Sequence, residues 1–296
     1  MNSTFKGTGV ALVTPFHKQG MIDFGSLEKL IEHCIGGGIN YLVIMGTTAE
    51  TATLTKEEKH ALSEFVIDVV NQRVPLVLGI GGNNTQEIVN SLRTKSLEGF
   101  DAILSVTPYY NKPQQRGIYL HYKNIAVVSP LPIIMYNVPS RTSVNMKVET
   151  TLQLANDFDN IIGIKEASGN IEQVMDIIRL RPKDFLVISG DDLLTLPLLA
   201  MGCDGVISVT ANAYPSEVSQ MVQLGLKGDV KKAREFHYKL SEFTQTLFDD
   251  GNPAGIKAAL EIKGLISNHL RLPLVKVEKP VYNHLASLIA DLDSIK

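Results

Sequence analysis

Cysteine is scarce in this chain. Only Cys34 and Cys203 occur among 296 residues, and both lie in apolar surroundings. Two thiols cannot build the framework of a disulfide-stabilised secreted fold, and such sparing use is typical of a reducing compartment. We therefore expect both to be buried, reduced side chains.

Long apolar runs and excess positive charge are also missing. No stretch reaches the length of about 18 apolar residues that a membrane-spanning helix requires. The segment Met1–Phe16 has neither the basic start nor the apolar run of a signal peptide. A net charge of −3 gives no positive field to attract nucleic acid or anionic lipid. We expect a cytoplasmic protein that neither binds nucleic acid nor associates with a membrane.

Metal and nucleotide motifs are absent too. The seven histidines are scattered, without a His-x-x-x-His pair and without cysteine spacing typical of zinc. The glycines of 79–82 follow the third apolar run and have the wrong spacing for a dinucleotide phosphate loop. We expect no metal and no cofactor.

What the chain does contain is a repeated unit, in which a short apolar run precedes a helix-like segment. Runs that are apolar throughout are typical of strands buried on both faces of a parallel sheet. The runs are Gly9–Thr14, Tyr41–Met45, Pro75–Ile80, Ala102–Val106, Ile133–Tyr136, Ile161–Ile164, Leu186–Ile188 and Val206–Val209.

Amphipathic segments separate these runs, among them Ser26–Ile35, Lys56–Val70, Gln86–Leu97 and Ile171–Ile178. Eight strand–helix repeats predict an α/β protein with a closed (β/α)8 TIM barrel. A doubly wound open sheet is the alternative, but it usually has fewer strands and a glycine-rich loop after the first. Here the first run leads into Thr14, Pro15 and Phe16, with no such loop.

The strands stop after Ala211, and helical segments complete the chain. We expect them at Ser216–Leu226, Val230–Phe248, Pro253–Ile266 and Val281–Leu292. These segments are longer than the single helix that should follow the eighth strand of a barrel. We therefore predict a catalytic barrel in residues 1–226 and a helical appendage in residues 227–296 that packs on it.

The polar residues that end the apolar runs should form the active site, because TIM-barrel chemistry occurs at the carboxyl ends of the strands. Hydroxyl groups dominate, with one lysine. The set is Thr14, Thr47, Thr48, Asn83, Thr107, Tyr109, Tyr110, Tyr136, Asn137, Lys165, Glu166, Asp191, Asp192, Thr210 and Asn212.

Lys165 is the most informative of them. It extends a buried strand, where strand alternation places it on the face of Gly163 and Ile161, and the glycine should leave space beside it. Loss of hydration lowers the pKa of a buried ammonium, and a neutral amine can attack a carbonyl to form a Schiff base. The structural alternative is an ion pair with Glu166, which alternation points to the opposite face.

The other candidates each have a functional and a structural interpretation. Tyr136 can relay protons or simply pack, and Thr47 and Thr48 can cradle a carboxylate or stabilise a turn. Arg141 can grip a carboxylate or lie free on the surface. For Asp191 and Asp192, capping of the following helix is a sufficient explanation.

At these residues the chain resembles the dihydrodipicolinate synthase family, within the N-acetylneuraminate lyase superfamily. The likeness runs from end to end. Its motifs are residues 46–50 (GTTAE), 106–111 (VTPYYN), 136–142 (YNVPSRT), 163–167 (GIKEA), 190–192 (GDD), 205–212 (GVISVTAN) and 270–274 (LRLPL).

The resemblance implies that Lys165 forms an imine with pyruvate and that Tyr136 transfers protons through Thr47 or Thr48. Arg141 would hold the carboxylate of aspartate semialdehyde, and Tyr110 would reach into a neighbouring subunit's site. Thr48 would bind the pyruvate carboxylate, with backbone contacts from Gly190 and Ile207. The product would enter diaminopimelate and lysine synthesis, and the assembly would be a homotetramer, a dimer of dimers.

The chain departs from the family pattern in two places. Ala49 stands where the family usually has glycine, so we expect a slightly different turn, since alanine tolerates positive φ poorly. Lysine-inhibited members carry histidine where this chain has Lys56 and Lys59, and a basic side chain should repel lysine. The positions that match a lysine-binding allosteric site are Thr51, Ala52, Lys56, Asn83, Glu87 and Tyr109.

Two rival functions remain. An N-acetylneuraminate lyase or 2-keto-3-deoxy sugar acid aldolase shares the lysine and the tyrosine, but typically has Gly-Ser-Thr and lacks the arginine, so Thr47 and Arg141 favour the synthase. A non-catalytic barrel would have lost the lysine or a relay hydroxyl. Lys165, Tyr136, Tyr110 and Thr48 are all present.

Overall fold

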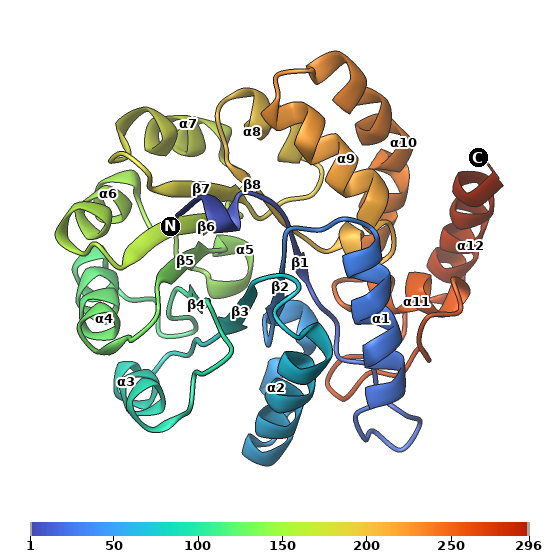
Figure 1. Cartoon of the computed structure of the whole chain (residues 1–296), viewed down its shortest axis with the longest axis horizontal. Coiled ribbons are helices and arrows are strands. Elements are labelled where there is room, and N and C mark those ends of the chain that lie inside the picture. Colours follow the sequence, from blue (N-terminus) through green and yellow to red (C-terminus); the bar gives the residue numbers. More distant parts are fainter. Residues whose placement is uncertain (1, 295–296) are drawn as a thin grey trace.

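A computed structural model describes residues 2–294 of the chain. Eight parallel strands form a closed barrel in sequence order, and β1 pairs with β8 to close it (Figure 1). The TIM-barrel prediction is confirmed. The strands are β1 (Gly7–Ala11), β2 (Tyr41–Ile44), β3 (Leu76–Gly79), β4 (Ala102–Val106), β5 (Ile133–Asn137), β6 (Ile161–Glu166), β7 (Leu186–Ser189) and β8 (Gly205–Ser208).

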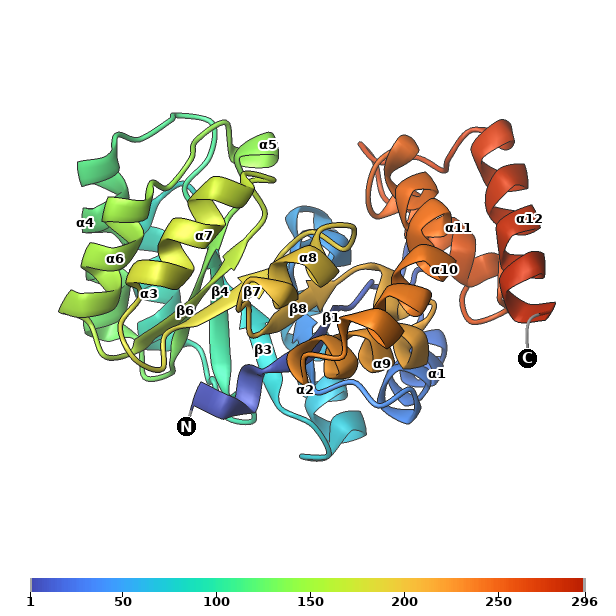
Figure 2. The ribbon, with the colours of Figure 1, turned by 90° about the horizontal axis from the view of Figure 1, so that it is seen from above.

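Helices surround the barrel. Between the strands lie α1 (Phe24–Gly36), α2 (Lys56–Val70), α3 (Thr85–Thr94), α4 (Gln115–Val128), α5 (Pro139–Thr142), α6 (Val148–Asp157), α7 (Ile171–Leu180) and α8 (Thr195–Ala200). After β8 come α9 (Pro215–Leu226), α10 (Val230–Asp249), α11 (Ala254–Ile262) and α12 (Lys279–Ser294). Figure 2 shows α11 and α12 together at one side of the barrel, far from α4 and α6.

Several element ends differ from the sequence expectation. β1 starts and ends earlier than Gly9–Thr14, and Thr14 lies in the loop that follows, where its hydroxyl donates to the carbonyl of Ala49. The predicted helix Pro253–Ile266 ends at Ile262, just before Gly264, which has φ +71°. The start of α2 matches its prediction because Thr55 and Glu58 form a capping box there.

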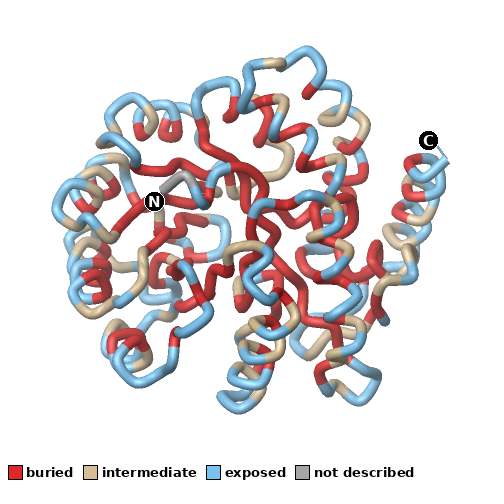
Figure 3. The backbone as a smooth tube through the Cα atoms, viewed as in Figure 1, coloured by how far each residue is buried: buried red, intermediate tan, exposed pale blue. Residues whose placement is uncertain are grey.

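The apolar side chains form two clusters, one inside the barrel and one between the strands and the helices. Tyr41, Val77, Leu104, Ile134 and Ile188 are among the inner ones. Figure 3 shows the buried residues concentrated along the strands and the inward faces of the helices. The interior of the barrel is therefore a packed core and not an open channel.

Cys34 and Cys203 are both buried and free, as expected. Among residues 2–294, none of the helices combines the length and apolar character needed to span a bilayer.

Candidate active site

Lys165 and Tyr136 lie side by side at the carboxyl end of the barrel. They occupy neighbouring strands, β6 and β5, in the same register position. Nζ of Lys165 is 4.5 Å from the centre of the Tyr136 ring. At this distance the ring face attracts the charged form of the amine. The neutral form lies equally close to the tyrosine. The barrel thus unites the two residues that the sequence singled out.

Burial determines the chemistry of the Lys165 amine, because the residue is only 6% exposed. Desolvation lowers the pKa of Lys165 to about 8, assisted by the positive charge of Arg141 and opposed by the negative charge of Asp192. A fraction of the amine is therefore neutral near physiological pH. That is the form that can act as a nucleophile.

The space beside Lys165 arises differently from the sequence expectation. A β-bulge interrupts the register of β5 and β6, so that Ile161 pairs with Ile133 but Gly163 pairs with Ile134. Ile161 consequently joins the outer cluster, and its predicted placement on the lysine's face is wrong. A Cβ at Gly163 would collide with Leu186, whereas one at Gly190 would lie 3.1 Å from Cε of Lys165. Gly190 is therefore the glycine that leaves room for the lysine stem.

Glu166 is not the partner of Lys165. Its carboxylate points away from the barrel interior and accepts hydrogen bonds from Asn137 and Gln173 side chains and from the backbone N–H of Ser168. This network satisfies the buried carboxylate without an ion pair. The structural alternative for Lys165 is thereby removed.

The Tyr136 phenol faces Thr47. Burial raises the pKa of Tyr136, while the charge of Arg141 and a hydrogen bond with the Thr47 side chain oppose that change. The phenol stays protonated at neutral pH and can exchange its proton with a neighbouring hydroxyl. Thr47 is exposed, so this hydroxyl connects the buried tyrosine with the rim.

Thr47 and Thr48 lie in a short 3-10 helix, η2 (Thr47–Ala49), directly after β2. Thr48 is buried, and its hydroxyl accepts a hydrogen bond of 3.0 Å from the Asn252 side-chain amide. Asn252 was not among the site residues predicted from the sequence, because it follows α10 and lies far from any strand along the chain. The positive φ of this turn falls on Glu50, at 54°, and not on Ala49. Ala49 is therefore not in the left-handed region, and the reason given for expecting a different turn does not apply.

Arg141 and Tyr110 are both exposed on the rim. Arg141 lies in α5, whose short turn follows β5 directly, and its charge acts on both Tyr136 and Lys165. Tyr110 is 87% exposed and has φ 73°, a left-handed conformation that is uncommon for an aromatic residue. The loop after β4 thus holds this phenol out from its own chain.

The two aspartates after β7 have different contacts. Asp191 accepts from the N–H of Leu194 and so supports the start of α8, as expected. Asp192 instead accepts from the N–H groups of Val209 and Thr210, so its predicted capping role is wrong. These bonds fasten the loop after β7 to the end of β8 and leave a negative charge close enough to influence Lys165.

The remaining predicted positions are distributed around the same end of the barrel. Ile207 is buried in β8, next to β1. The residues that correspond to a lysine-binding allosteric site lie after β3 and β4, in the first turn of α3 and around the start of α2. These are Thr51, Ala52, Lys56, Asn83, Glu87 and Tyr109. Among the described residues, no group of three or more His, Cys, Asp or Glu side chains is arranged to hold a metal ion.

Known proteins are similar to this chain over nearly its whole length. Residues 4–292 match the model of the dihydrodipicolinate synthetase family. A relative from Flavobacterium psychrophilum, named 4-hydroxy-tetrahydrodipicolinate synthase, is 53% identical over 281 residues, which cover 95% of this chain and 96% of the relative.

Two solved structures are similar throughout. Dihydrodipicolinate synthase from Thermotoga maritima superposes with a TM-score of 0.95 at 38% identity, covering 98% of this chain and 99% of that one. The chloride-inhibited dihydrodipicolinate synthase from Acinetobacter baumannii, solved in complex with pyruvate, has a TM-score of 0.94 at 40% identity, with coverage of 98% and 99%.

Proposed function

This chain belongs to the dihydrodipicolinate synthetase family, and from that membership and the site geometry we propose that it is a 4-hydroxy-tetrahydrodipicolinate synthase. It is a Schiff-base, pyruvate-dependent lyase of the lysine and diaminopimelate pathway. The second substrate in this proposal is L-aspartate 4-semialdehyde. The observation that carries it is the buried Lys165 amine, with a pKa of about 8, beside the Tyr136 ring.

The first half of the proposed reaction forms the imine. The lone pair of Lys165 Nζ attacks the carbonyl carbon of pyruvate, the C=O double bond becomes a single bond, and a proton passes from the nitrogen to that oxygen to give a carbinolamine. Tyr136 donates a second proton to the resulting hydroxyl, which leaves as water, and the C=N bond forms. The Thr47 hydroxyl supports this role because it hydrogen-bonds to the phenol and reaches the rim.

The second half makes the carbon–carbon bond. Loss of a proton from the pyruvate methyl group converts the imine to an enamine. Its terminal carbon attacks the aldehyde carbon of the semialdehyde, whose C=O double bond becomes a single bond as the oxygen takes up a proton to form a hydroxyl. The amino group of that substrate then attacks the imine carbon and displaces Lys165, which closes the ring and frees the enzyme. Water is the only other product.

The other site residues have binding roles in this proposal. Thr48 and its neighbouring backbone amide bind the pyruvate carboxylate, with backbone contacts from Gly190 and Ile207. Arg141 holds the carboxylate of the semialdehyde, which its exposed guanidinium at the rim supports. Tyr110 completes the proton relay in a neighbouring subunit. Its 87% exposure and left-handed backbone support this.

The assembly and the compartment are proposals of the same kind. We propose a homotetramer, a dimer of dimers, in the cytoplasm, with residues 1–226 as the catalytic barrel and 227–296 as its helical appendage. The exposed phenol of Tyr110 supports a contact between subunits. The two free, buried thiols support a reducing compartment.

Borohydride reduction in the presence of pyruvate tests the proposed function. Hydride addition to the imine carbon converts it to a stable secondary amine, and peptide mapping locates it. We expect one adduct, on Lys165. Lys257 is the internal control, since its pKa is also lowered to about 8 but its side chain is completely buried in an ion pair. An adduct on any other residue would overturn the mechanism. Parallel assays of condensation and of sialic-acid cleavage separate the synthase from its sister lyases.

Tyr136→Phe tests the proton relay. Removal of the phenol should reduce kcat by roughly 10²- to 10⁴-fold, because general acid catalysis contributes about that much, with a smaller effect on KM for pyruvate. Tyr119→Phe is the matched control, since the Tyr119 hydroxyl donates to Asp157 on the outer helices, away from the site. If both variants kept the wild-type kcat, Tyr136 would have no catalytic role.

Lysine should inhibit this enzyme weakly or not at all. Lys56 and Lys59 lie in the segment that corresponds to the allosteric site of lysine-inhibited family members. The positive charge of Lys95 is close enough to interact with both of them. A further ammonium would be repelled. The condensation rate should therefore stay constant in a lysine titration that extends into the millimolar range at physiological ionic strength. Strong inhibition at low lysine concentration would contradict this, and Lys56→His is the variant expected to increase sensitivity.

A further inference from the structure

The turn that carries Thr47 and Thr48 contains a strained residue. Glu50 separates η2 from the next 3-10 helix, η3 (Thr51–Thr53), with φ 54° and ψ 35°. A residue with a Cβ atom adopts this left-handed region at a cost in free energy, and it persists only where its surroundings fix it. Contacts that restrain Glu50 therefore also restrict Thr47 and Thr48, because Glu50 ends the short helix that holds them.

The Glu50 carboxylate is held from the C-terminal helices. Nζ of Lys257, in α11, donates to one oxygen, and the backbone N–H of Arg271 donates to the other at 2.9 Å. Both side chains of the ion pair are 0% exposed. Lys257 also donates to the carbonyl of His269 at 2.9 Å and lies 4.2 Å from the centre of the Phe16 ring. Separating the pair would leave a buried charge without its partner, so these contacts favour this position of the turn.

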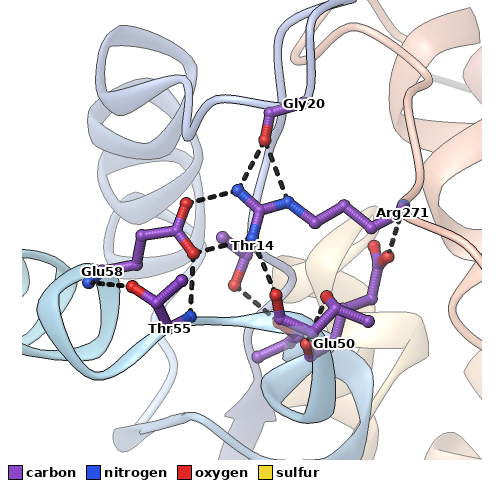
Figure 4. A network of polar contacts seen from close by, with 8 residues as sticks. Thr14, Gly20, Glu50, Thr55, Glu58 and Arg271 are labelled. Atoms are coloured by element: carbon purple, nitrogen blue, oxygen red, sulfur yellow. Dashed lines mark hydrogen bonds and ion pairs between the residues drawn. The ribbon is translucent and has the colours of Figure 1, made fainter.

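Arg271 attaches the same C-terminal segment to three neighbouring segments, and Figure 4 shows its contacts with Gly20 and Glu58. Its guanidinium donates to the carbonyl of Gly20 before α1, to the carbonyl of Thr53 in η3, and to the carboxylate of Glu58 in α2. The hydroxyl of Thr14, in the loop after β1, donates to the carbonyl of Ala49 at 2.8 Å. Contacts from both ends of the chain thus restrain the residues directly after Thr48.

Asn252 acts on the substrate-binding hydroxyl itself. Its side-chain amide donates to Oγ1 of Thr48 at 3.0 Å, in a fully buried contact. A hydroxyl has one hydrogen to donate, and because this oxygen already accepts from Asn252, its hydrogen is free to point into the site. A carboxylate is an acceptor only, so this orientation suits pyruvate.

We propose that Lys257 and Asn252 are positioning residues for pyruvate, through which the helices after β8 set the Thr47–Thr48 turn. Lys257 acts through Glu50, and Asn252 acts through Thr48. Neither is proposed to touch the substrate. This inference rests on the proposed function, because it assigns the turn to the pyruvate carboxylate.

The double variant Glu50→Gln/Lys257→Met tests the proposal, because it removes both charges together and keeps the shapes of the side chains. Replacing both partners avoids an unpaired buried charge and should preserve the fold. We expect KM for pyruvate to rise by roughly 10- to 100-fold, the scale of a small misplacement in a site, with a much smaller change in kcat. The pyruvate concentration for half-maximal borohydride trapping should rise by the same factor. A role in stability alone would change the melting temperature but neither pyruvate value.

Two further variants complete the experiment. Lys263→Met/Asp293→Asn neutralises another ion pair of the same appendage, which packs on Tyr214 and does not contact the turn among the described residues, and should bind pyruvate as the wild type does. Asn252→Ala removes the Thr48 contact without altering any charge and should also raise KM for pyruvate. If the Glu50 and Lys257 double variant did not fold, Asn252→Ala would decide alone.

The outcomes are distinct from a failure of the proposed function. An adduct on Lys165 in the wild type tests the function, whereas the change in pyruvate concentration tests the positioning. If the folded variants Glu50→Gln/Lys257→Met and Asn252→Ala both bound pyruvate within about twofold of the wild type, the positioning proposal would be overturned.

Discussion

Replacing Lys165 with methionine is expected to abolish condensation and, at the same time, to make the protein more stable. Without the amine no imine forms, so the rate should fall on the order of 10⁴-fold or more. Methionine retains the length of the lysine stem and fills the same space beside Gly190. The loss of activity is then a loss of chemistry and not of packing.

The gain in stability follows from the lowered pKa of Lys165. Burial reduces it from the ordinary value of 10.5 to about 8, so the folded protein holds this proton less tightly than the unfolded chain. The wild type therefore carries a penalty below pH 8 that disappears as pH rises from 8 to 10.5. Removing the charge should raise the free energy of unfolding by about 2–3 kcal/mol at pH 7.

Urea denaturation at pH 7 and at pH 10, at one protein concentration, measures this effect. The difference between Lys165→Met and the wild type should be largest at pH 7 and should shrink at pH 10. A variant that was less stable than the wild type at pH 7 would show that Lys165 has a stabilising partner in the folded protein, contrary to the proposed role.

Lys257→Met alone should have the opposite effect on stability, although the pKa of Lys257 is also lowered by burial to about 8. Removing Lys257 leaves the completely buried Glu50 carboxylate without its counter-ion. Breaking a buried pair in this way costs about 3–5 kcal/mol. We therefore expect a marked loss of stability at pH 7, in the same urea experiment.

Lys263→Met is the control for this prediction. Lys263 pairs with Asp293, whose side chain is half exposed, so its removal should cost about 0–1 kcal/mol. Equal stability losses for Lys257→Met and Lys263→Met would contradict the assignment of a special role to the buried pair. The Glu50→Gln/Lys257→Met variant should recover much of the loss, since it leaves no charge unpaired.

Lys165 and Lys257 show that a lowered pKa does not by itself determine the role of a lysine. Both have pKa values lowered to about 8. Lys165 follows an apolar run and was identified from the sequence as a nucleophile. Lys257 lies in α11, and nothing in its neighbours along the chain indicates a partner in the loop after β2. Its pairing with Glu50 spans 207 residues.

The sequence by itself determined the barrel, the strand that bears Lys165 and the polar rim around it. These features follow from local periodicity, because a strand buried on both faces must be apolar along its length. Sequence also placed Tyr136 on the strand next to Lys165, since strands that follow one another in a barrel are neighbours.

Only the tertiary structure decided the rest. The β-bulge moved Ile161 out of the interior, Gly190 and not Gly163 made room for the lysine, and Asp192 bonded to the end of β8. Asn252, Lys257 and Arg271 reach the turn after β2 across more than 200 residues of chain. Such contacts depend on how the barrel closes and how the last helices pack against it, and periodicity within a segment contains no information about either.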